Sequence, residues 1–373
     1  MALKDPDEGR LIIKEVARQP KRVIFGIDKP LDYSVMALIT PLLRDGPLGK
    51  EFSQAHVYLL DKPGRGKTAA FTYISAAVRA KFGRVNGQCD TLPREFTGEE
   101  RVDRVTGIRT LFKGPLFSNI FFFDEITRTP PMGQAPFLGA MEGAHVQMFV
   151  THTDMGKPRI EAKLFPLYPI SDDPDEKDFY FIVFGTANPI EYEGTFPMSE
   201  AQKERFTYSF RMGLPPREEE KKIRARNVIN QKVEEVTDLK TLLDISRMVS
   251  QVELSDQAHE YIMRVIENSR PYSQDIEDYG HPIERRASSS LINFINRYVA
   301  MGCSPRRNFH DEAAAKAWAW MMRGEDRVAT VDDVKAILPI TMEHVLLLSP
   351  QSIGDDITTK KIVERIMAET EVP

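Results

Sequence analysis

The stretch Asp61-Lys62-Pro63-Gly64-Arg65-Gly66-Lys67-Thr68 joins the apolar run 57–60 to a segment with helical character, 69–81. A strand, a glycine-bearing loop and a helix in this order are the context of a phosphate-binding loop, whose backbone N–H groups and helix N-terminus face a phosphate. We expect Lys67 to neutralise the β- and γ-phosphates, and the Thr68 hydroxyl to bind Mg²⁺. The predicted nucleotide site comprises Pro63, Gly64, Arg65, Gly66, Lys67, Thr68 and Ala69, with Gly26 from an upstream apolar segment.

The first position of this loop departs from the usual pattern G-x-x-x-x-G-K-T, because Asp61 stands where glycine is usual. Aspartate tolerates unusual backbone angles better than most residues, so the loop can still form. A carboxylate near phosphates is nevertheless unfavourable. Taken alone, the loop could also be a chance G-x-G-K-T in a surface turn.

A second apolar run, 119–123, ends in Asp124 and Glu125. This pattern is typical of a buried parallel strand that places carboxylates at its C-terminal end. Asp124 is suited to hold Mg²⁺ through water, and Glu125 to polarise the attacking water as a general base. An acidic turn after a core strand is the alternative, and the phosphate-binding loop upstream favours the catalytic interpretation. A third run, 179–184, leads to Asn188, whose amide can orient a water molecule or simply form a turn.

The composition is that of an ordinary globular chain long enough for two or three domains, with 373 residues, 42% of them hydrophobic and 28% charged. The net charge of −5 argues against a dedicated nucleic-acid binder. Two distant cysteines fit no metal spacing and indicate a reduced compartment. The N-terminal residues lack the apolar core of a signal peptide, and no apolar run is long enough to span a membrane. We therefore expect a cytoplasmic protein without membrane insertion.

The pattern along the chain predicts an α/β fold followed by a helical domain. Residues 1–214 form the nucleotide-binding domain, a parallel sheet flanked by helices, with an extended hairpin insertion at about 146–178. Pro215-Pro216 marks a boundary. Residues 215–349 form an all-α lid, and 350–373 a tail with one helix. Among the shorter elements we expect a helix at 32–43, a loop at 269–282 and a helix at 286–301.

With these residues the chain resembles the MoxR family of AAA+ ATPases. The resemblance is most specific at 124–131 with Gln134 and 140–142, and at 188–197 with 200–202 and 205–206. It extends to Leu92-Pro93, Thr97-Gly98, 286–288 and 344–349, and covers most of the chain between residues 23 and 349. The region 146–178 is longer than the resemblance implies, so it is either a substrate-contact device or a solvated loop insertion.

The resemblance implies a homo-oligomeric ring, usually a hexamer, that binds ATP and Mg²⁺ between subunits. By position, Asn188 corresponds to the first sensor, Arg205 to an arginine finger acting on the adjacent subunit's ATP, and Arg286 to the second sensor in the lid. A trans-acting arginine makes hydrolysis depend on assembly, because transition-state charge is neutralised only when the ring closes. Family members often act as chaperones that mature or remodel protein complexes. Their usual partners contain a von Willebrand factor A domain.

We therefore expect a cytoplasmic ATPase that converts ATP and water to ADP and phosphate and remodels a protein client. Two alternatives remain. An ATP-binding assembly scaffold with little turnover is supported by Asp61 and opposed by Glu125. A nucleic-acid motor is opposed by the acidic charge balance, and salt-dependent DNA binding would revive it. The basic pairs Arg285-Arg286 and Arg306-Arg307 are assigned to lid or interface roles.

Overall fold

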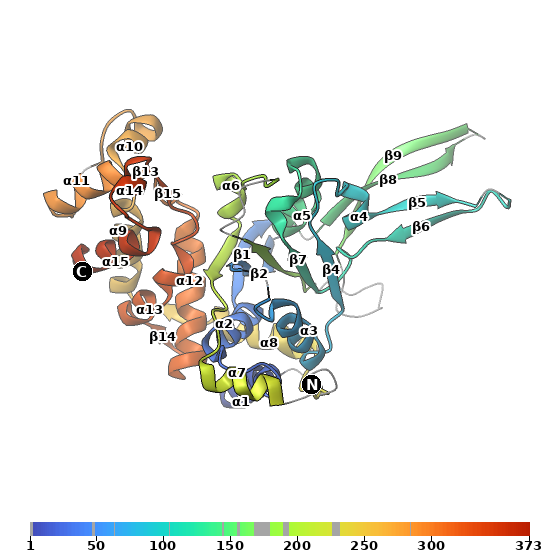
Figure 1. The fold of residues 1–373 in the computed structure, drawn as a ribbon, viewed down its shortest axis with the longest axis horizontal. Helices are drawn as coiled ribbons and strands as arrows, with labels where there is room; N and C mark the ends of the chain where they lie inside the picture. Colours follow the sequence, from blue (N-terminus) through green and yellow to red (C-terminus); the bar gives the residue numbers. More distant parts are fainter. Residues whose placement is uncertain are drawn as a thin grey trace.

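The computed structural model describes residues 3–46, 49–62, 64–103, 105–143, 145–154, 157–167, 180–188, 194–225, 232–283 and 285–373. Pro63 of the predicted loop and residues 155–156 and 168–178 of the predicted insertion lie outside this range. An α/β part carries two projecting hairpins on one side and adjoins a helical part on the other (Figure 1).

The α/β part is built on a five-stranded sheet in which every pairing is parallel. The strand order is β11 (Phe206–Phe210), β3 (His56–Leu60), β10 (Ile182–Ala187), β7 (Ile120–Asp124) and β4 (Phe82–Asn86). The central strand β10 is buried along its whole length, as expected of a parallel strand covered on both faces. The carboxyl ends of all five strands meet at one edge, which brings the residues following β3, β7 and β10 together.

Helices cover both faces of the sheet because successive strand residues point to opposite sides. On one face Phe71 stacks on Phe184 with ring centroids 4.2 Å apart. Phe71 belongs to α3 (Lys67–Ala77), which packs with α1 (Pro6–Lys21), and α1 in turn packs on α2 (Asp28–Ile39). On the other face Phe123 contacts Phe96 and Phe137, from α4 (Pro93–Thr97) and α5 (Pro131–Gly143). The sheet is therefore the middle of three layers.

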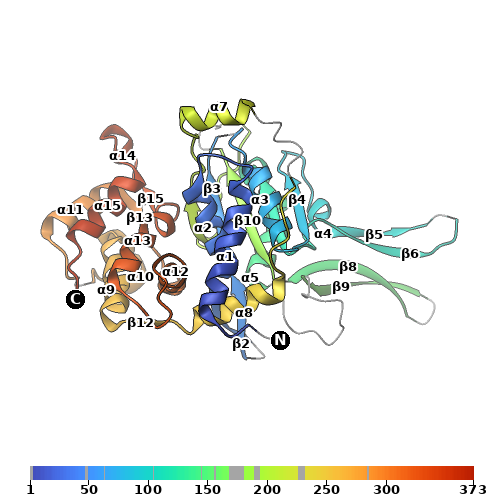
Figure 2. The ribbon, with the colours of Figure 1, turned by 90° about the horizontal axis from the view of Figure 1, so that it is seen from below.

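Three antiparallel hairpins extend from this part. They are β1 (Pro41–Gly46) with β2 (Gly49–Gln54), β5 (Gly98–Val102) with β6 (Arg109–Lys113), and β8 (His145–Asp154) with β9 (Lys157–Pro166). The last two project in the same direction, away from the helical part (Figures 1 and 2). They touch where the Thr151 backbone N–H donates to Glu100 Oε2 at 3.1 Å. The β8–β9 pair falls in the region for which a hairpin insertion was predicted.

The helical part contains most of the chain after residue 250. Its helices are α9 (Asp256–Asn268), α10 (Tyr272–Tyr279), α11 (Ser289–Tyr298), α12 (Arg307–Trp318), α13 (Val331–Thr341), α14 (Gln351–Gly354) and α15 (Thr359–Glu369). A π-helical turn, Ala319–Arg323, continues α12, and the short strands β12 (Glu253–Leu254), β13 (Val299–Met301), β14 (Val328–Ala329) and β15 (Leu347–Leu348) link the helices. In the described part of the chain no helix is long and apolar enough to span a membrane.

The domain limits 1–214, 215–349 and 350–373 remain a prediction. The packing of two helices, α15 and α8 (Leu239–Ser250), is relevant to where these limits lie. The last helix, α15, packs on α9, α11 and α13, within the helical part. By contrast, α8 packs on α1, α2 and β1 as well as on α12. The other short elements are α7 (Arg217–Ala225), α6 (Glu200–Lys203) and the 3-10 turn Ile126–Arg128.

Three element predictions were wrong in their limits. The helix expected at 32–43 ends at Ile39, because Thr40 precedes a proline and is extended. The expected loop at 269–282 contains α10, which begins after Pro271 and ends at Gly280 in a left-handed conformation. The helix expected at 286–301 starts only at Ser289, because the Ser288 side chain caps it, and it ends at Tyr298.

Candidate active site

The predicted phosphate-binding loop lies between β3 and α3, the strand and helix that the sequence predicts on either side of it. Gly64 and Gly66 have φ values of 78° and 73°, in the left-handed region that glycine adopts without strain. Gly26 also has a positive φ, and a Cβ there would lie 2.7 Å from the Pro215 Cβ. The upstream glycine therefore permits close contact with the chain that leaves the sheet after β11.

Lys67 begins α3 and is 9% exposed. Its Nζ donates to the backbone oxygens of Asp61 at 3.0 Å and Lys62 at 3.2 Å. Burial lowers the pKa of Lys67, while the charges of Asp124, Asp61 and Glu125 oppose this shift. The ammonium group thus lies within the field of the predicted catalytic carboxylates, and a phosphate would compete with the two carbonyls for it.

The unusual Asp61 is 3% exposed, and its carboxylate is occupied by the protein itself. Oδ1 accepts the Lys62 backbone N–H at 2.8 Å and lies 3.4 Å from the Arg65 Nε. Oδ2 accepts the backbone N–H of Gly213 at 3.1 Å. The carboxylate therefore joins the loop to the segment after β11, and the objection that it faces the phosphates loses its basis.

The carboxylates at the end of β7 are held by β10 and β4. The Thr186 hydroxyl donates to Asp124 Oδ1 at 2.8 Å and accepts the Glu125 N–H at 2.9 Å. Asp124 Oδ2 also pairs with Arg84 Nη2 at 3.1 Å. Asn188 directly follows β10, between the strand that carries the loop and the strand that carries the carboxylates. Lys67, Asp124, Glu125 and Asn188 therefore share one edge of the sheet, which we call the nucleotide edge.

Glu125 itself has φ 55° and ψ 53°, a left-handed conformation. For a non-glycine residue this costs roughly 1–2 kcal/mol, which the surrounding contacts must offset. Its Oε2 lies 3.1 Å from Arg128 Nε, and a Cβ at Gly87 would lie 2.3 Å from the Glu125 carbonyl oxygen. Strain of this kind is common where a side chain must be aimed at a reacting group.

The donor set fits a magnesium ion carried by a nucleotide. Thr68, in the first turn of α3, and Asp124 offer one hydroxyl and one carboxylate, and Mg²⁺ binds one or two such groups together with substrate phosphates and water. Within the described residues, no three His, Cys, Asp or Glu side chains gather as an all-protein metal site would require.

The predicted arginine finger lies at the opposite edge of the sheet. Arg205 precedes β11, whose first residue pairs with His56 at the start of β3. Its Nη2 pairs with Glu142 Oε2 at 2.9 Å, and Arg306 Nη2 lies 3.6 Å from the other oxygen of Glu142. We call the group formed by Arg205, Arg306 and Glu142 the arginine edge. A five-residue strand rises about 16 Å, so the sheet separates it from the subunit's own phosphate-binding loop.

Arg286 is exposed in the connection between α10 and α11, and Figure 1 shows these two helices on the side of the helical part that faces away from α3. The structure does not bring it to either edge, and its sensor role remains a prediction. Two residues with geometry that bears on catalysis were not named from the sequence, Thr186 and Arg84, and Arg306 was assigned only to a lid or interface role. Thr186 could have been noticed because it lies two residues before Asn188 and points to the same face.

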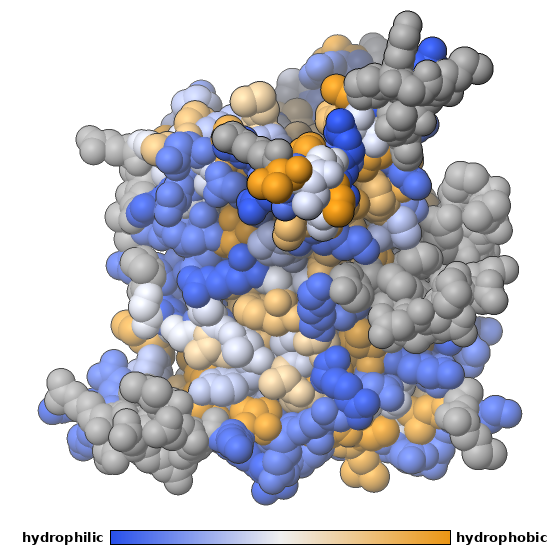
Figure 3. Space-filling view, turned by 90° about the vertical axis from the view of Figure 1, so that its right-hand side faces the viewer, coloured by the Kyte–Doolittle hydropathy of each residue, from blue (hydrophilic) through white to orange (hydrophobic). Residues whose placement is uncertain are grey.

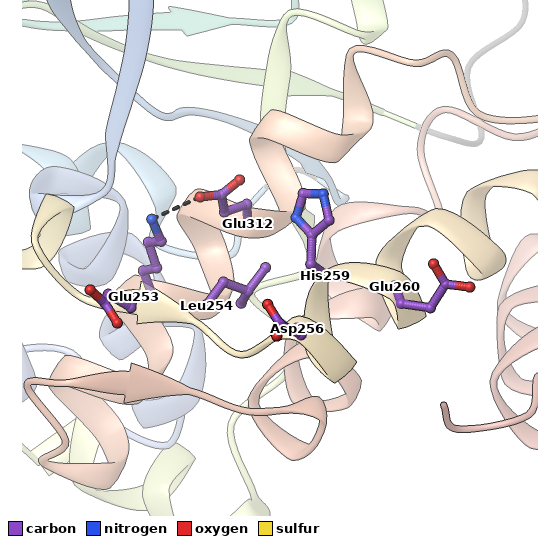
Figure 4. A pocket seen from close by; sticks show the side chains of 7 residues that line it. Glu253, Leu254, Asp256, His259, Glu260 and Glu312 are labelled. Carbon is purple, nitrogen blue, oxygen red and sulfur yellow. Dashed lines mark ion pairs between the residues drawn. The ribbon is translucent and has the colours of Figure 1, made fainter.

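A separate open hollow lies between α9 and α12 in the helical part. Its lining consists of Glu253, Leu254, Asp256, His259, Glu260, Glu312 and Lys316 (Figure 4). Lys316 Nζ pairs with Glu312 at 2.7 Å. None of these residues was a predicted site residue.

Comparison with known proteins identifies the family. The family model described as "ATPase family associated with various cellular activities" matches residues 56–162. The chain is 27% identical over 354 residues to Chaperone MoxR1 of Mycobacterium tuberculosis, covering 95% of this chain and 80% of that protein. It is 25% identical over 306 residues to Protein MoxR of Paracoccus denitrificans, covering 80% and 81%. These relatives confirm the predicted resemblance to the MoxR family of AAA+ ATPases.

The chain is also 29% identical over 324 residues to the uncharacterized protein YeaC of Bacillus subtilis, covering 86% of each. A solved protein of Cytophaga hutchinsonii shares the fold with a TM-score of 0.76 and 23% identity, covering 99% of this chain and 97% of that one. The predicted family and the predicted fold class are thus confirmed, and with them the general kind, a nucleotide-binding ATPase. The roles of individual residues are not tested by these comparisons.

Proposed function

We propose that this MoxR-family chain hydrolyses ATP to ADP and phosphate in a closed ring of subunits, a hexamer by family resemblance. The ring would use the cycle to remodel a protein client. The observation that carries the proposal is the pair of edges: the sheet presents a nucleotide edge on one side and the arginine edge on the other. A head-to-tail ring places the arginine edge of one subunit against the nucleotide edge of the next.

At the nucleotide edge, the backbone of Gly64–Gly66 and the ammonium of Lys67 bind the β- and γ-phosphates. Thr68 and Asp124 would hold Mg²⁺, which neutralises developing phosphate charge. Glu125 accepts a proton from the attacking water, and Asn188 orients that water. Thr186 positions both catalytic carboxylates, because its hydroxyl donates to the Asp124 carboxylate and accepts the Glu125 backbone N–H.

At the arginine edge, Arg205 and Arg306 neutralise transition-state charge on the neighbour's γ-phosphate. Glu142 balances the two guanidinium groups within the free protomer, where both already lie against it. When the ring closes, phosphate oxygens of the neighbour's nucleotide replace the Glu142 carboxylate as the partner of both guanidinium groups. The phosphate also accepts further charge-assisted hydrogen bonds. Hydrolysis then depends on ring closure, since a lone subunit cannot bring its own arginines around the sheet.

The projecting hairpins are the proposed client-contact region. One face of β8–β9 exposes Phe149, Ile160 and Leu164, each at least 64% exposed. Cross-strand pairing places Phe149 opposite Ala162 and Ile160 opposite Thr151, so this face carries apolar and uncharged side chains. Figure 3 views the molecule from the hairpin side, where apolar residues lie among hydrophilic ones. Such exposed apolar groups fit a protein partner, and by family resemblance one with a von Willebrand factor A domain.

Steady-state ATP hydrolysis, measured beside sedimentation with and without ATP, tests this proposal. Wild type should hydrolyse ATP as an oligomer. Glu125→Gln should bind ATP and assemble but lose at least about 100-fold in kcat, because general-base catalysis contributes on this scale. A wild type that turns over no faster than Glu125→Gln, with client protein also supplied, would support the ATP-binding scaffold instead. The Asp61 carboxylate bonds to the protein itself, which weakens the support that this residue gave to the scaffold.

A further inference from the structure

Arg307, in the first turn of α12, is fully buried and bonds directly to the edge strand of the sheet. Its Nη1 donates to the Phe206 carbonyl oxygen at 2.9 Å, and its Nη2 to the Thr207 carbonyl oxygen at 3.0 Å. Nη2 also pairs with the buried carboxylate of Asp311 at 3.2 Å. The register of β11 against β3 shifts between Phe206 and Tyr208, and at this irregularity one planar guanidinium reaches two successive carbonyl oxygens, which in a regular strand would point to opposite sides.

Further bonds join the same two segments. The Ser304 backbone N–H donates to Glu204 Oε1 at 3.1 Å, and Nδ1 of His310 lies 2.8 Å from the Thr207 hydroxyl. His344 Nε2 lies 3.0 Å from the Phe206 carbonyl oxygen and must donate to it, because a carbonyl only accepts. The contact between β11 and the helical part is therefore polar, directional and buried.

This contact lies immediately beside both arginines of the arginine edge. Arg205 directly precedes Phe206, and Arg306 directly precedes Arg307. Joining Phe206 to Arg307 fixes the spacing of the two backbones, and the neighbouring side chains then reach the two oxygens of Glu142. A buried ion pair adds little stability compared with apolar packing, so its presence here favours a geometric role over a purely stabilising one.

We propose that Arg307 is a positioning residue, which holds α12 on β11 so that Arg205 and Arg306 reach the neighbouring subunit's nucleotide as one unit. The inference rests on the proposed function, because the two arginines contact a reacting group, the neighbour's γ-phosphate, only in the proposed ring. The helical part then takes part in hydrolysis through this junction, independently of the role predicted for Arg286.

The test compares Arg307→Lys with Arg264→Lys. Lysine keeps the charge beside Asp311 but cannot span two successive carbonyls as the planar guanidinium does. Arg264 is a matched control: it is 7% exposed and binds one carboxylate, Glu260, and one backbone oxygen, that of Glu371. The readouts are kcat, the Kd for ATP, the unfolding temperature and the oligomeric state. Where Arg307→Lys does not fold, Asp311→Asn replaces it with the same expectations.

Arg307→Lys should lower kcat about 10- to 100-fold with the Kd for ATP within about twofold of wild type, as expected when a catalytic group is misplaced. Arg264→Lys should keep kcat within about twofold. In an Arg205→Ala/Arg306→Ala background, Arg307→Lys should cause no further loss in single-turnover hydrolysis, because both residues through which it acts are already removed.

The inference is overturned if Arg307→Lys loses no more kcat than Arg264→Lys at a similar drop in unfolding temperature. It is also overturned if Arg307→Lys lowers the rate of single-turnover hydrolysis by the same factor with and without the pair Arg205 and Arg306. Both results leave the proposed function intact, provided that Arg205→Ala alone lowers turnover far below that of wild type. Full turnover by Arg205→Ala would instead contradict the proposed function and this inference together.

Discussion

Replacing Asp61 by the glycine usual at the start of a phosphate-binding loop should destabilise this protein. The carboxylate is 3% exposed and accepts the N–H groups of Lys62 and Gly213. Asp61 is not among the residues with positive φ in the described chain, so glycine relieves no backbone strain. Asp61→Gly therefore removes interactions without supplying a conformational gain.

The size of the effect follows from these contacts. A hydrogen bond to a charged group contributes about 1.5–3 kcal/mol, and the bond to the half-buried Gly213 is the better shielded of the two. The exposed Lys62 can regain water at its N–H, so its bond adds less. Glycine adds about 0.5–1 kcal/mol of unfolded-state entropy. The sum is roughly 2–5 kcal/mol, or on the order of 3–6 °C in Tm for cooperative unfolding of a chain of this length.

Urea unfolding and thermal scans of wild type, Asp61→Gly and Asp61→Asn measure this effect. Asp103→Gly is the matched control, because the Asp103 carboxylate also accepts two backbone N–H groups, those of Val105 and Thr106, but on the surface. Asp103→Gly should lower the free energy of unfolding by less than about 1 kcal/mol, apart from the entropy cost of introducing glycine. An Asp61→Gly variant at least as stable as wild type would refute the reasoning. So would a tenfold gain in ATP affinity, which would mean that the carboxylate does act on the phosphates.

Lys67→Ala should abolish detectable ATP binding in a fluorescent-nucleotide titration while the fold is kept, and retained micromolar affinity would argue against the loop assignment. Glu142→Gln should shift ATP-stimulated assembly to lower protein concentration by about two- to tenfold, because Arg205 and Arg306 no longer share a competing carboxylate. Burial lowers the pKa of His344 to about 3. The unfolded histidine titrates near pH 6.5, so this group's contribution to stability is complete above that pH and declines as pH falls. Wild type should therefore lose about 2 kcal/mol more than His344→Gln between pH 7 and pH 5 in urea unfolding, and parallel losses would contradict the buried neutral histidine.

Much of the nucleotide edge could be predicted because its signals are local. A glycine-bearing loop between a strand and a helix, and an apolar run ending in Asp124 and Glu125, each indicate their own secondary structure. Parallel pairing then brings the strand ends together without further information. The left-handed backbone of Glu125 has no such local signal, since it depends on the close approach of Gly87.

The arginine edge could be predicted only in part because its contacts join distant segments. Arg205 was assigned from family resemblance, but its partner Glu142 lies 63 residues away and Arg306 comes from the helical part. The direction of the Asp61 carboxylate likewise depends on Gly213, 152 residues downstream. By contrast, α10 carried local signals in Pro271 and Gly280 that the expected loop at 269–282 overlooked.

The central claim is that each nucleotide site is completed by the next subunit, and mixing two inactive variants tests it directly. Glu125→Gln keeps the arginine edge and loses the base, whereas Arg205→Ala keeps the base and loses the arginine. Each alone should be nearly inactive. An equal mixture, assembled with ATP, should form intact sites at about a quarter of the interfaces of a randomly mixed ring and recover a matching share of wild-type turnover. A mixture no more active than its components, with mixed rings verified by mass, would contradict the account.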